Sequence, residues 1–202
     1  TTANKNVAMG ANALGAATTG CSNVAIGDGA IDTGVVTGNY NTAINLSALQ
    51  DVTSGKENVA IGPDAMKNLT TGCVNIAIGS SALAGAVVTG INNIAIGTST
   101  MDALTSGICN VAIGRNALGA STTGCHNVAI GDIAMGTGVT TSVDNIAIGN
   151  MALTDLTSGY NNTAIGKCAL GNTTTGCLNI ALGNSALAGA VVTGINNIAI
   201  GT

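Results

Sequence analysis

A short motif recurs through the whole chain at nearly constant spacing. Each unit reads N-[VIT]-A-[IML]-G-x-x-A-[LMI], with few departures, and continues through a Thr-rich piece to a Gly. The steps between successive units run 17, 18, 17 and then repeat, so three units make a 52-residue block. A fixed period of this size predicts stacked structural repeats. The units begin at Asn6, Asn23, Asn41, Asn58, Asn75, Asn93, Asn110, Asn127, Asn145, Asn162, Asn179 and Asn197.

Each unit, numbered from its Asn as position 1, contains three apolar segments. Positions 2–4, such as Val24–Ile26, predict a short strand whose two faces are both apolar and therefore both buried. Positions 8–9, such as Ala117–Leu118, form a second apolar pair. Positions 12–14, such as Leu69–Thr71, form a third, strand-prone segment that ends at Gly72. In the 18-residue units the extra residue falls near this third segment, as in Ala86–Gly90.

Position 5 is Gly in every unit but one, where Asn45 replaces it. Asn is the other residue that best tolerates a left-handed backbone, so we expect a corner with positive φ at this position. We expect the first-position asparagines to stack in a column whose amides can bond along the rod. Structural turn roles are therefore assigned to the twelve asparagines above and to Gly10, Gly27, Asn45, Gly62, Gly79, Gly97, Gly114, Gly131, Gly149, Gly166, Gly183 and Gly201.

The charged residues test this assignment. They occur only at positions 6–7, such as Asp28 and Arg115, at positions 10–11, such as Lys67, and at positions 16–18, such as Glu57 and Asp144. Charge confined to three corners fits coils with buried sides and solvated turns. The sequence therefore predicts an all-β fold, a parallel β-solenoid (β-roll or β-helix) with 17–18 residues per coil and a 52-residue three-coil super-repeat. We expect one continuous array over residues 1–202, a fragment of a longer fibre chain.

Composition excludes several other classes of protein. With 46% hydrophobic and 7% charged residues, the chain is the reverse of a disordered sequence. It has no Phe or Trp, so a conventional core would lack its largest side chains. A net charge of −4 offers no basic surface for nucleic acid, and no apolar run is long enough for membrane insertion. Nothing at Thr1 resembles a signal peptide.

No constellation of catalytic or metal-binding residues is visible. His126 is the only histidine and lies at a corner, where we expect it to face solvent. The nine carboxylates are dispersed and match no metal-ligand spacing, and the glycines lack the context of a phosphate-binding loop. The prediction is a protein that is not an enzyme and has no cofactor, no catalytic residue and no metal site.

The cysteines form a pattern of their own. Cys21, Cys73, Cys125 and Cys177 share position 16 and recur once in each three-coil block, which places them about 14 Å apart in a stack of rungs. That spacing is too long for a disulfide within one chain. Cys109 and Cys125 lie on adjacent rungs close enough to pair, and Cys168 has no evident partner. The thiols are either free small fillers or, alternatively, an interchain thiol column or bridge.

The motif N-V-A-I-G-x-x-A resembles the head repeats of trimeric autotransporter adhesins. The longer unit, as in Tyr160–Gly166 with Thr173–Gly176, is similar to repeats of phage-type and bacterial tail-fibre proteins. The resemblance covers the whole chain, although the adhesin head unit is shorter than the unit found here. It implies a homotrimer, located extracellularly or on a virion or cell surface, that serves as the shaft of a tail fibre or surface fibre and contributes to attachment to a cell-surface receptor or glycan.

Two alternatives remain open from the residues alone. A single-chain triangular solenoid could bury all three apolar segments in one interior without a trimer. An ice-binding β-solenoid would use regular Thr columns, and Thr recurs at positions 13 and 14. Only one of two adjacent columns can face outward, and Ser54, Ser106 and Ser158 interrupt position 14.

Overall fold

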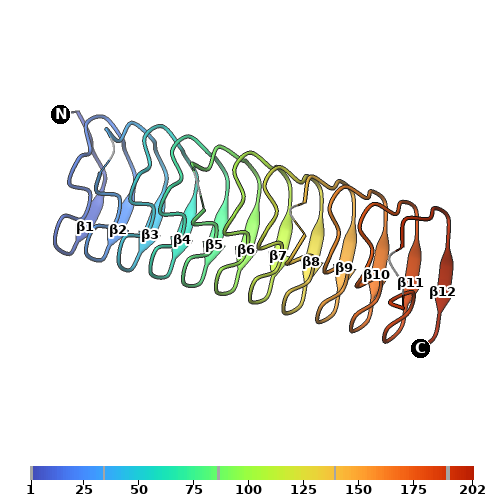
Figure 1. The fold of residues 1–202 in the computed structure, drawn as a ribbon. Helices are drawn as coiled ribbons and strands as arrows, with labels where there is room; N and C mark the ends of the chain where they lie inside the picture. The colour runs from blue at the N-terminus through green and yellow to red at the C-terminus, as the bar shows by residue number, and fades with distance from the viewer. Residues whose placement is uncertain (1, 34, 86, 139, 190–191) are drawn as a thin grey trace.

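The computed structural model describes residues 2–33, 35–85, 87–138, 140–189 and 192–202. In these ranges the chain winds into a straight rod of stacked coils, with its two ends at opposite ends of the rod (Figure 1). Each coil contributes one three-residue strand, and all neighbours pair in parallel in chain order. The predicted parallel β-solenoid is confirmed. The strands are β1 (Val7–Met9), β2 (Val24–Ile26), β3 (Thr42–Ile44), β4 (Val59–Ile61), β5 (Ile76–Ile78), β6 (Ile94–Ile96), β7 (Val111–Ile113), β8 (Val128–Ile130), β9 (Ile146–Ile148), β10 (Thr163–Ile165), β11 (Ile180–Leu182) and β12 (Ile198–Ile200).

The register places equivalent positions of the motif on top of one another. The central Ala of each strand pairs with the central Ala of the next, as in Ala112↔Ala129. Parallel strands stand about 4.8 Å apart, so eleven steps between twelve strands give a sheet about 53 Å long. The number of residues between successive motifs is thus the number of residues in one turn of the solenoid.

The core is narrow and filled by Ala and by aliphatic side chains of middle size, Leu, Met, Val and Ile. From the second coil onward the central Ala of every strand but the last is fully buried. The position 8–9 pairs, such as Ala65 and Met66, fill a second side of the core, and Leu69, Leu104 and Leu156 fill the third. A cross-section this small has no room for Phe or Trp, which agrees with their absence from the sequence.

Two expectations about the segments are wrong in detail. The strand is not buried on both faces in the single chain, because positions 2 and 4, such as Ile76 and Ile78, point outward and are half-buried or exposed. Alternate residues of a strand face opposite sides, and only the side with the central Ala faces the interior. The third segment forms isolated bridges rather than a continuous strand, for example Leu69↔Val88.

The extra residue of the 18-residue coils is absorbed between the second and third segments. In the coil that starts at Asn75, Leu83 lies 17 residues after Met66, which is the shorter of the two coil steps. Val88, however, lies two residues more than that step after Leu69, with which it forms a bridge. At Asn93 the spacing between stacked residues equals the longer coil step of 18 residues, because the backbone N–H of Asn93 donates to the Asn75 side chain. Ala86, part of the segment predicted to hold the insertion, lies outside the described residues.

Candidate functional site

The first-position asparagines form a buried ladder along the rod. From Asn23 to Asn179 each of them is fully buried. The Oδ1 atom of Asn93 accepts hydrogen bonds from the backbone N–H of Asn110 at 3.1 Å and from its Nδ2 at 3.0 Å. The backbone bond recurs at every step from Asn6 to Asn197. Each amide is therefore fixed by the coil that follows it.

The same side chains also close each coil upon itself. The Nδ2 of Asn110 donates to the carbonyl of Gly124, 14 residues later, at 2.7 Å, and Asn162 does the same to Gly176. These bonds satisfy polar groups that the core would otherwise leave unpaired. The Asn column thus joins neighbouring coils and closes each coil by hydrogen bonds inside the rod. This structural role goes beyond the turn role that the sequence assigned to it.

The position 5 residues all have positive φ, between 131° and 137° at the glycines and 104° at Asn45. A second constraint comes from the next coil, because a Cβ atom on Gly79 would lie 2.6 Å from the carbonyl oxygen of Gly97. At Asn45 the side-chain Oδ1 accepts the backbone N–H of Leu46 at 2.8 Å, which stabilises a local turn. Position 5 is therefore both a left-handed corner and a point of close approach between coils.

Left-handed backbone also occurs at positions that sequence reasoning missed. Position 7, position 9 and the residue before each Asn have φ between 50° and 64°. Position 7 and the residue before Asn are rich in Asn, Asp and Ser, such as Asn116 and Asn161, and this enrichment was a usable signal. Position 9 gave none, because it carries buried Leu, Met or Ile, such as Leu118 and Met135, which disfavour this conformation.

The outer face of the sheet is the most regular surface of the rod. It consists of the position 2 and position 4 side chains, which we call the outer strand face. Each strand presents Val, Ile or Thr at position 2 and Ile, Met or Leu at position 4, so the face carries no charge from β1 to β12. Its exposed members include Val7, Met9, Ile78, Ile113, Ile146, Ile165, Ile180, Ile198 and Ile200.

A second regular surface is a column of hydroxyl groups, one per coil, at the end of the third segment; its members precede a Gly, except Thr141, which precedes Ser142. Every member is exposed: Thr19, Thr37, Ser54, Thr71, Thr89, Ser106, Thr123, Thr141, Ser158, Thr175 and Thr193. We call it the hydroxyl column. The preceding threonines are less exposed. Four of their hydroxyls donate to carbonyls of the next coil, those of Thr18, Thr53, Thr105 and Thr157, as Thr105 Oγ1 does to the carbonyl of Thr122 at 3.1 Å. Only one of the two Thr columns is thus free to meet solvent.

All six cysteines lie in the described residues and are free. In the predicted column, the thiols of Cys21, Cys73, Cys125 and Cys177 each donate to the carbonyl of the Thr two residues earlier, at 3.2 to 3.4 Å. The pairing of Val111 with Val128 sets Cys109 level with His126 rather than with Cys125, and both cysteines are free.

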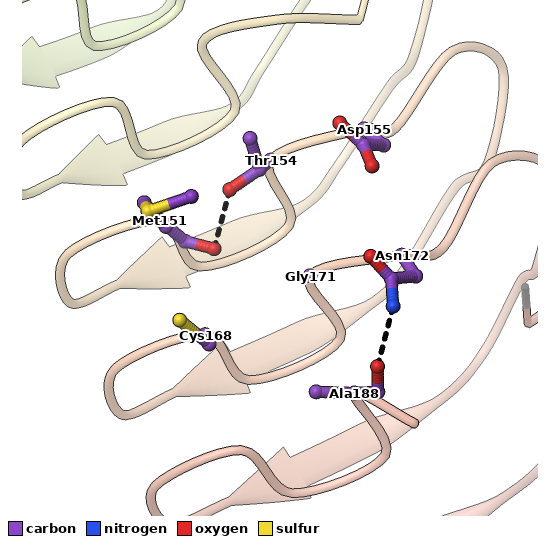
Figure 2. Close-up of a pocket in the computed structure, with 7 residues that line it drawn as sticks. All are labelled: Met151, Thr154, Asp155, Cys168, Gly171, Asn172 and Ala188. Atoms are coloured by element: carbon purple, nitrogen blue, oxygen red, sulfur yellow. Dashed lines mark hydrogen bonds between the residues drawn. The ribbon is translucent and has the colours of Figure 1, made fainter. Parts of the chain in front are cut away.

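Cys168 lines a shallow pocket of about 270 Å³ between three consecutive coils (Figure 2). Met151, Thr154 and Asp155 come from one coil, Cys168, Gly171 and Asn172 from the next, and Ala188 from the third. Its polar groups are engaged locally: Asn172 Nδ2 donates to the carbonyl of Ala188 at 2.6 Å, and Asp155 accepts a bond from Thr137 at 2.7 Å. One thiol and one engaged carboxylate do not form a nucleophile–base pair.

Electrostatic interactions are confined to the corners, as the sequence predicted. Arg115 and Asp132 pair at 2.8 Å, and Lys67 and Asp64 at 3.2 Å, with all four side chains well exposed. Pairs of this kind contribute little to stability. Burial raises the pKa of the Asp102 carboxyl above its ordinary value of 3.8, and a backbone hydrogen bond opposes the shift.

Comparison with protein-family models and with curated proteins gave no match. Over the described ranges, no group of three or more His, Cys, Asp or Glu side chains could hold a metal ion. The same ranges contain no helical segment with the length and hydrophobicity of a membrane span. The outer strand face and the hydroxyl column are the two extended regular surfaces that the rod offers to a partner.

Proposed function

We propose that this chain is the shaft of an elongated fibre on a virion or bacterial surface, in which copies of the chain pack together through the outer strand face. The supporting observation is that face: a charge-free strip, apolar except for Thr42 and Thr163, on the sheet that runs from β1 to β12. Figure 1 shows the course of that sheet along the rod. A rigid rod with such a strip can support attachment to a receptor or glycan on another cell without chemistry of its own.

Leaving the strip exposed to water is unfavourable for a single chain. Soluble monomers rarely expose large contiguous apolar patches, and patches of that kind mark interaction surfaces. Interface cores are depleted in charged residues, and the outer strand face carries none over about 53 Å. The strip also repeats at the rung spacing, so it is complementary in length and register to another copy of itself.

The number of copies in the proposal is three. It comes from the resemblance of the motif to trimeric adhesin heads and tail-fibre repeats, because the strip would equally accommodate a face-to-face dimer. In a trimer, the three outer strand faces would surround a common axis parallel to the rod. The side chains at positions 2 and 4 would then be buried against the partner chains. Each strand would thus be buried on both faces, as is typical of strands that are apolar on both faces.

The test is the mass of the native particle in solution, measured by light scattering after gel filtration. The proposal expects three times the 19.3 kDa of one chain. The double variant Ile113→Lys with Ile165→Lys should dissociate, because it would bury two rings of ammonium groups. Its control is Thr123→Lys with Thr175→Lys, which adds the same charges to the hydroxyl column of the same two coils and should leave the mass unchanged. A native mass of one chain would end the proposal.

A second candidate function, ice binding, has one observation in its favour. The hydroxyl column carries an exposed Thr or Ser on every coil, at a spacing of about 4.8 Å. Its serines keep the hydroxyl, so the column is not interrupted chemically. A thermal-hysteresis measurement tests the candidate: activity in the native protein that Thr123→Lys with Thr175→Lys abolishes would support it, and no activity in the native protein would remove it.

A further inference from the structure

The third side of the core changes from apolar to polar partway along the rod. From the second coil to the sixth it is filled by Val36, Val52, Leu69, Val88 and Leu104, all fully buried. In the next two coils the same places carry Ser121 and Thr140, which are also fully buried. Because a short hydroxyl side chain gains less from burial than Leu or Val does, these two coils pack less favourably on their third side than the coils before them.

Hydrogen bonds do not compensate for the lost apolar packing. The hydroxyls of Thr140 and Ser142 are buried and have no hydrogen-bond partner. Ser121 Oγ donates a long bond, 3.4 Å, to the carbonyl of Thr140. A buried polar group without a partner favours any open conformation in which water reaches it. The closed third side is therefore destabilised at this place.

Ser142 also interrupts a column of glycines. Along the described rod, the residue whose carbonyl closes each coil by accepting the Asn side chain is Gly on every other coil. A Cβ atom on Gly107 would lie 2.3 Å from the carbonyl oxygen of Gly124, whereas one on Gly124 would lie 3.0 Å from the carbonyl oxygen of Ser142. The two coils thus approach each other less closely at Ser142 than the preceding pair of coils does.

The backbone of the third segment differs at the same step. In the other three 52-residue blocks this segment forms a parallel bridge to the next coil, Ala17↔Val36, Leu69↔Val88 and Thr173↔Val192. The equivalent residues of the remaining block are Ser121 and Thr140, which both lie in the described ranges and form no bridge. The loss of side-chain packing therefore coincides with a missing backbone link.

The sheet, by contrast, continues through this part of the rod without a change of register. Val111 of β7 pairs with Val128 of β8, and Val128 pairs with Ile146 of β9 (Figure 1). The coils that begin at Asn110 and Asn127 are thus held firmly on the side of the sheet and weakly on the third side.

We propose that the rod has a flexure point between these two coils, where the third side opens while the strands stay paired. Opening lets water reach the hydroxyls of Thr140 and Ser142, which the closed coil leaves unpaired. Local opening of this kind needs less free energy than unfolding of the whole molecule. It gives an otherwise straight rod one place at which to bend, and it does not depend on how many chains form the proposed fibre.

The experiment measures amide hydrogen–deuterium exchange of the native chain by mass spectrometry. Peptides that cover residues 119–124 and 140–144 should exchange about tenfold faster or more than the equivalent peptides of the preceding block, 67–72 and 88–92. Peptides from β7, β8 and β9 should exchange as slowly as those from β4, β5 and β6. Equal rates in the two blocks, or fast exchange in the strands as well, would overturn the proposal.

A matched variant gives this block the third side of the preceding block. It combines Ser121→Leu, Thr140→Val and Ser142→Gly, which introduce the residues found 52 positions earlier at Leu69, Val88 and Gly90. Exchange in residues 119–124 and 140–144 should slow to the rate of the preceding block. Exchange that stays fast in the variant would show that these side chains do not cause the opening.

Thr173→Leu is the control. Thr173 also has a buried, unpaired hydroxyl, but it keeps its bridge to Val192 and lies three coils beyond Ser121. The control should leave the exchange of residues 119–124 unchanged. If it slows that exchange as much as the triple variant does, the amides exchange through unfolding of the whole rod and the flexure point is wrong.

Discussion

Single residues in this rod are constrained mainly by the coil above and the coil below. At Gly79 the backbone is left-handed, and any Cβ atom would collide with the carbonyl of Gly97. At Asn110 the side chain bonds to both neighbouring asparagines and closes its own coil. Neither constraint involves a ligand, and both recur along most of the rod.

Gly79→Val should therefore cost far more stability than Ser80→Val next to it. A β-branched residue is disfavoured at a φ of 131°, and its Cβ would lie 2.6 Å from the Gly97 oxygen. We expect a loss of about 3 kcal/mol or more at Gly79 and less than about 0.5 kcal/mol at the exposed Ser80. Urea unfolding measures both. Equal losses would show that position 5 is not the strained corner.

Asn110→Ala tests the buried ladder. The change leaves the backbone N–H of Asn127 and the carbonyl of Gly124 without their partners in the interior. Unpaired buried groups cost about 1–3 kcal/mol each, so the free energy of unfolding should fall by about 3 kcal/mol. The control is Asn184→Ala at an exposed corner, which should change it little. A loss below about 1 kcal/mol for Asn110→Ala would contradict this, because it would mean that water satisfies the two groups in place of the Asn110 side chain.

Asp102→Asn tests the one carboxyl group with a raised pKa. Its folded-state pKa lies above the ordinary 3.8 because burial disfavours the charged form. The folded protein then binds a proton more tightly than the unfolded chain does, so stability falls as pH rises from 3.8 through the folded pKa. The variant should melt higher than the native protein at neutral pH and show no such gain at a pH below the ordinary pKa. Asp28→Asn, which removes a charge at an exposed corner, is the control for net charge; an equal gain there would contradict the burial effect.

At the scale of one coil, no element is stable alone. A three-residue strand has too little surface to fold by itself, and its hydrogen bonds all go to neighbouring coils. The core column of the third segment varies from coil to coil, however. Val36, Val88 and Val192 occupy it in three of the 18-residue coils, while Thr140 occupies the equivalent place in the fourth.

Thr140→Val should stabilise the rod. The Thr140 hydroxyl is fully buried and has no hydrogen-bond partner, which costs about 1–3 kcal/mol relative to a paired group. Val has nearly the same shape and is already accepted at Val88, the equivalent place in the preceding three-coil block. The midpoint of thermal unfolding should rise. The reverse change, Val88→Thr, should lower it by a similar amount; a rise in both, or in neither, would contradict the argument.

At the scale of the whole molecule, the three-coil block is the unit that can be added or removed. Removing residues 58–109 joins Glu57 to Asn110 and places β7 on β3 in the register that β4 now holds. Stability in a solenoid is a sum over coils and their neighbours, and the new neighbours match the old ones. The shortened chain should fold and lose about 14 Å of length, three rungs at roughly 4.8 Å each.

The matched control removes residues 58–83, about one and a half coils. It would place apolar pairs against the corners of the next coil, so core residues would become exposed and charges buried. This chain should not fold cooperatively. Circular dichroism and small-angle scattering distinguish the two outcomes. If both deletions behave alike, the 17-18-17 spacing is not the structural period.

Much of this architecture was predictable from the sequence because the same residue types recur at the same positions of successive repeats. The Asn column, the position 5 corner and the confinement of charge to turns each follow from a residue type recurring at a fixed place. Stacking equivalent positions then requires only parallel pairing between adjacent coils. The number of residues per coil and the absence of helix from the described ranges follow from the same spacing.

The tertiary structure decided what no single coil encodes. It placed Leu118 and its equivalents in left-handed backbone, because burial and rung-to-rung bonds outweigh the preference of Leu against that conformation. It turned positions 2 and 4 outward and left the apolar strip uncovered in the single chain. It also brought the side chains of His126 and Asp144, one coil length apart in the chain, to within 3.8 Å of each other. Contacts between side chains that are distant in sequence can be predicted only when two things are known: the coil length and the direction in which each corner points.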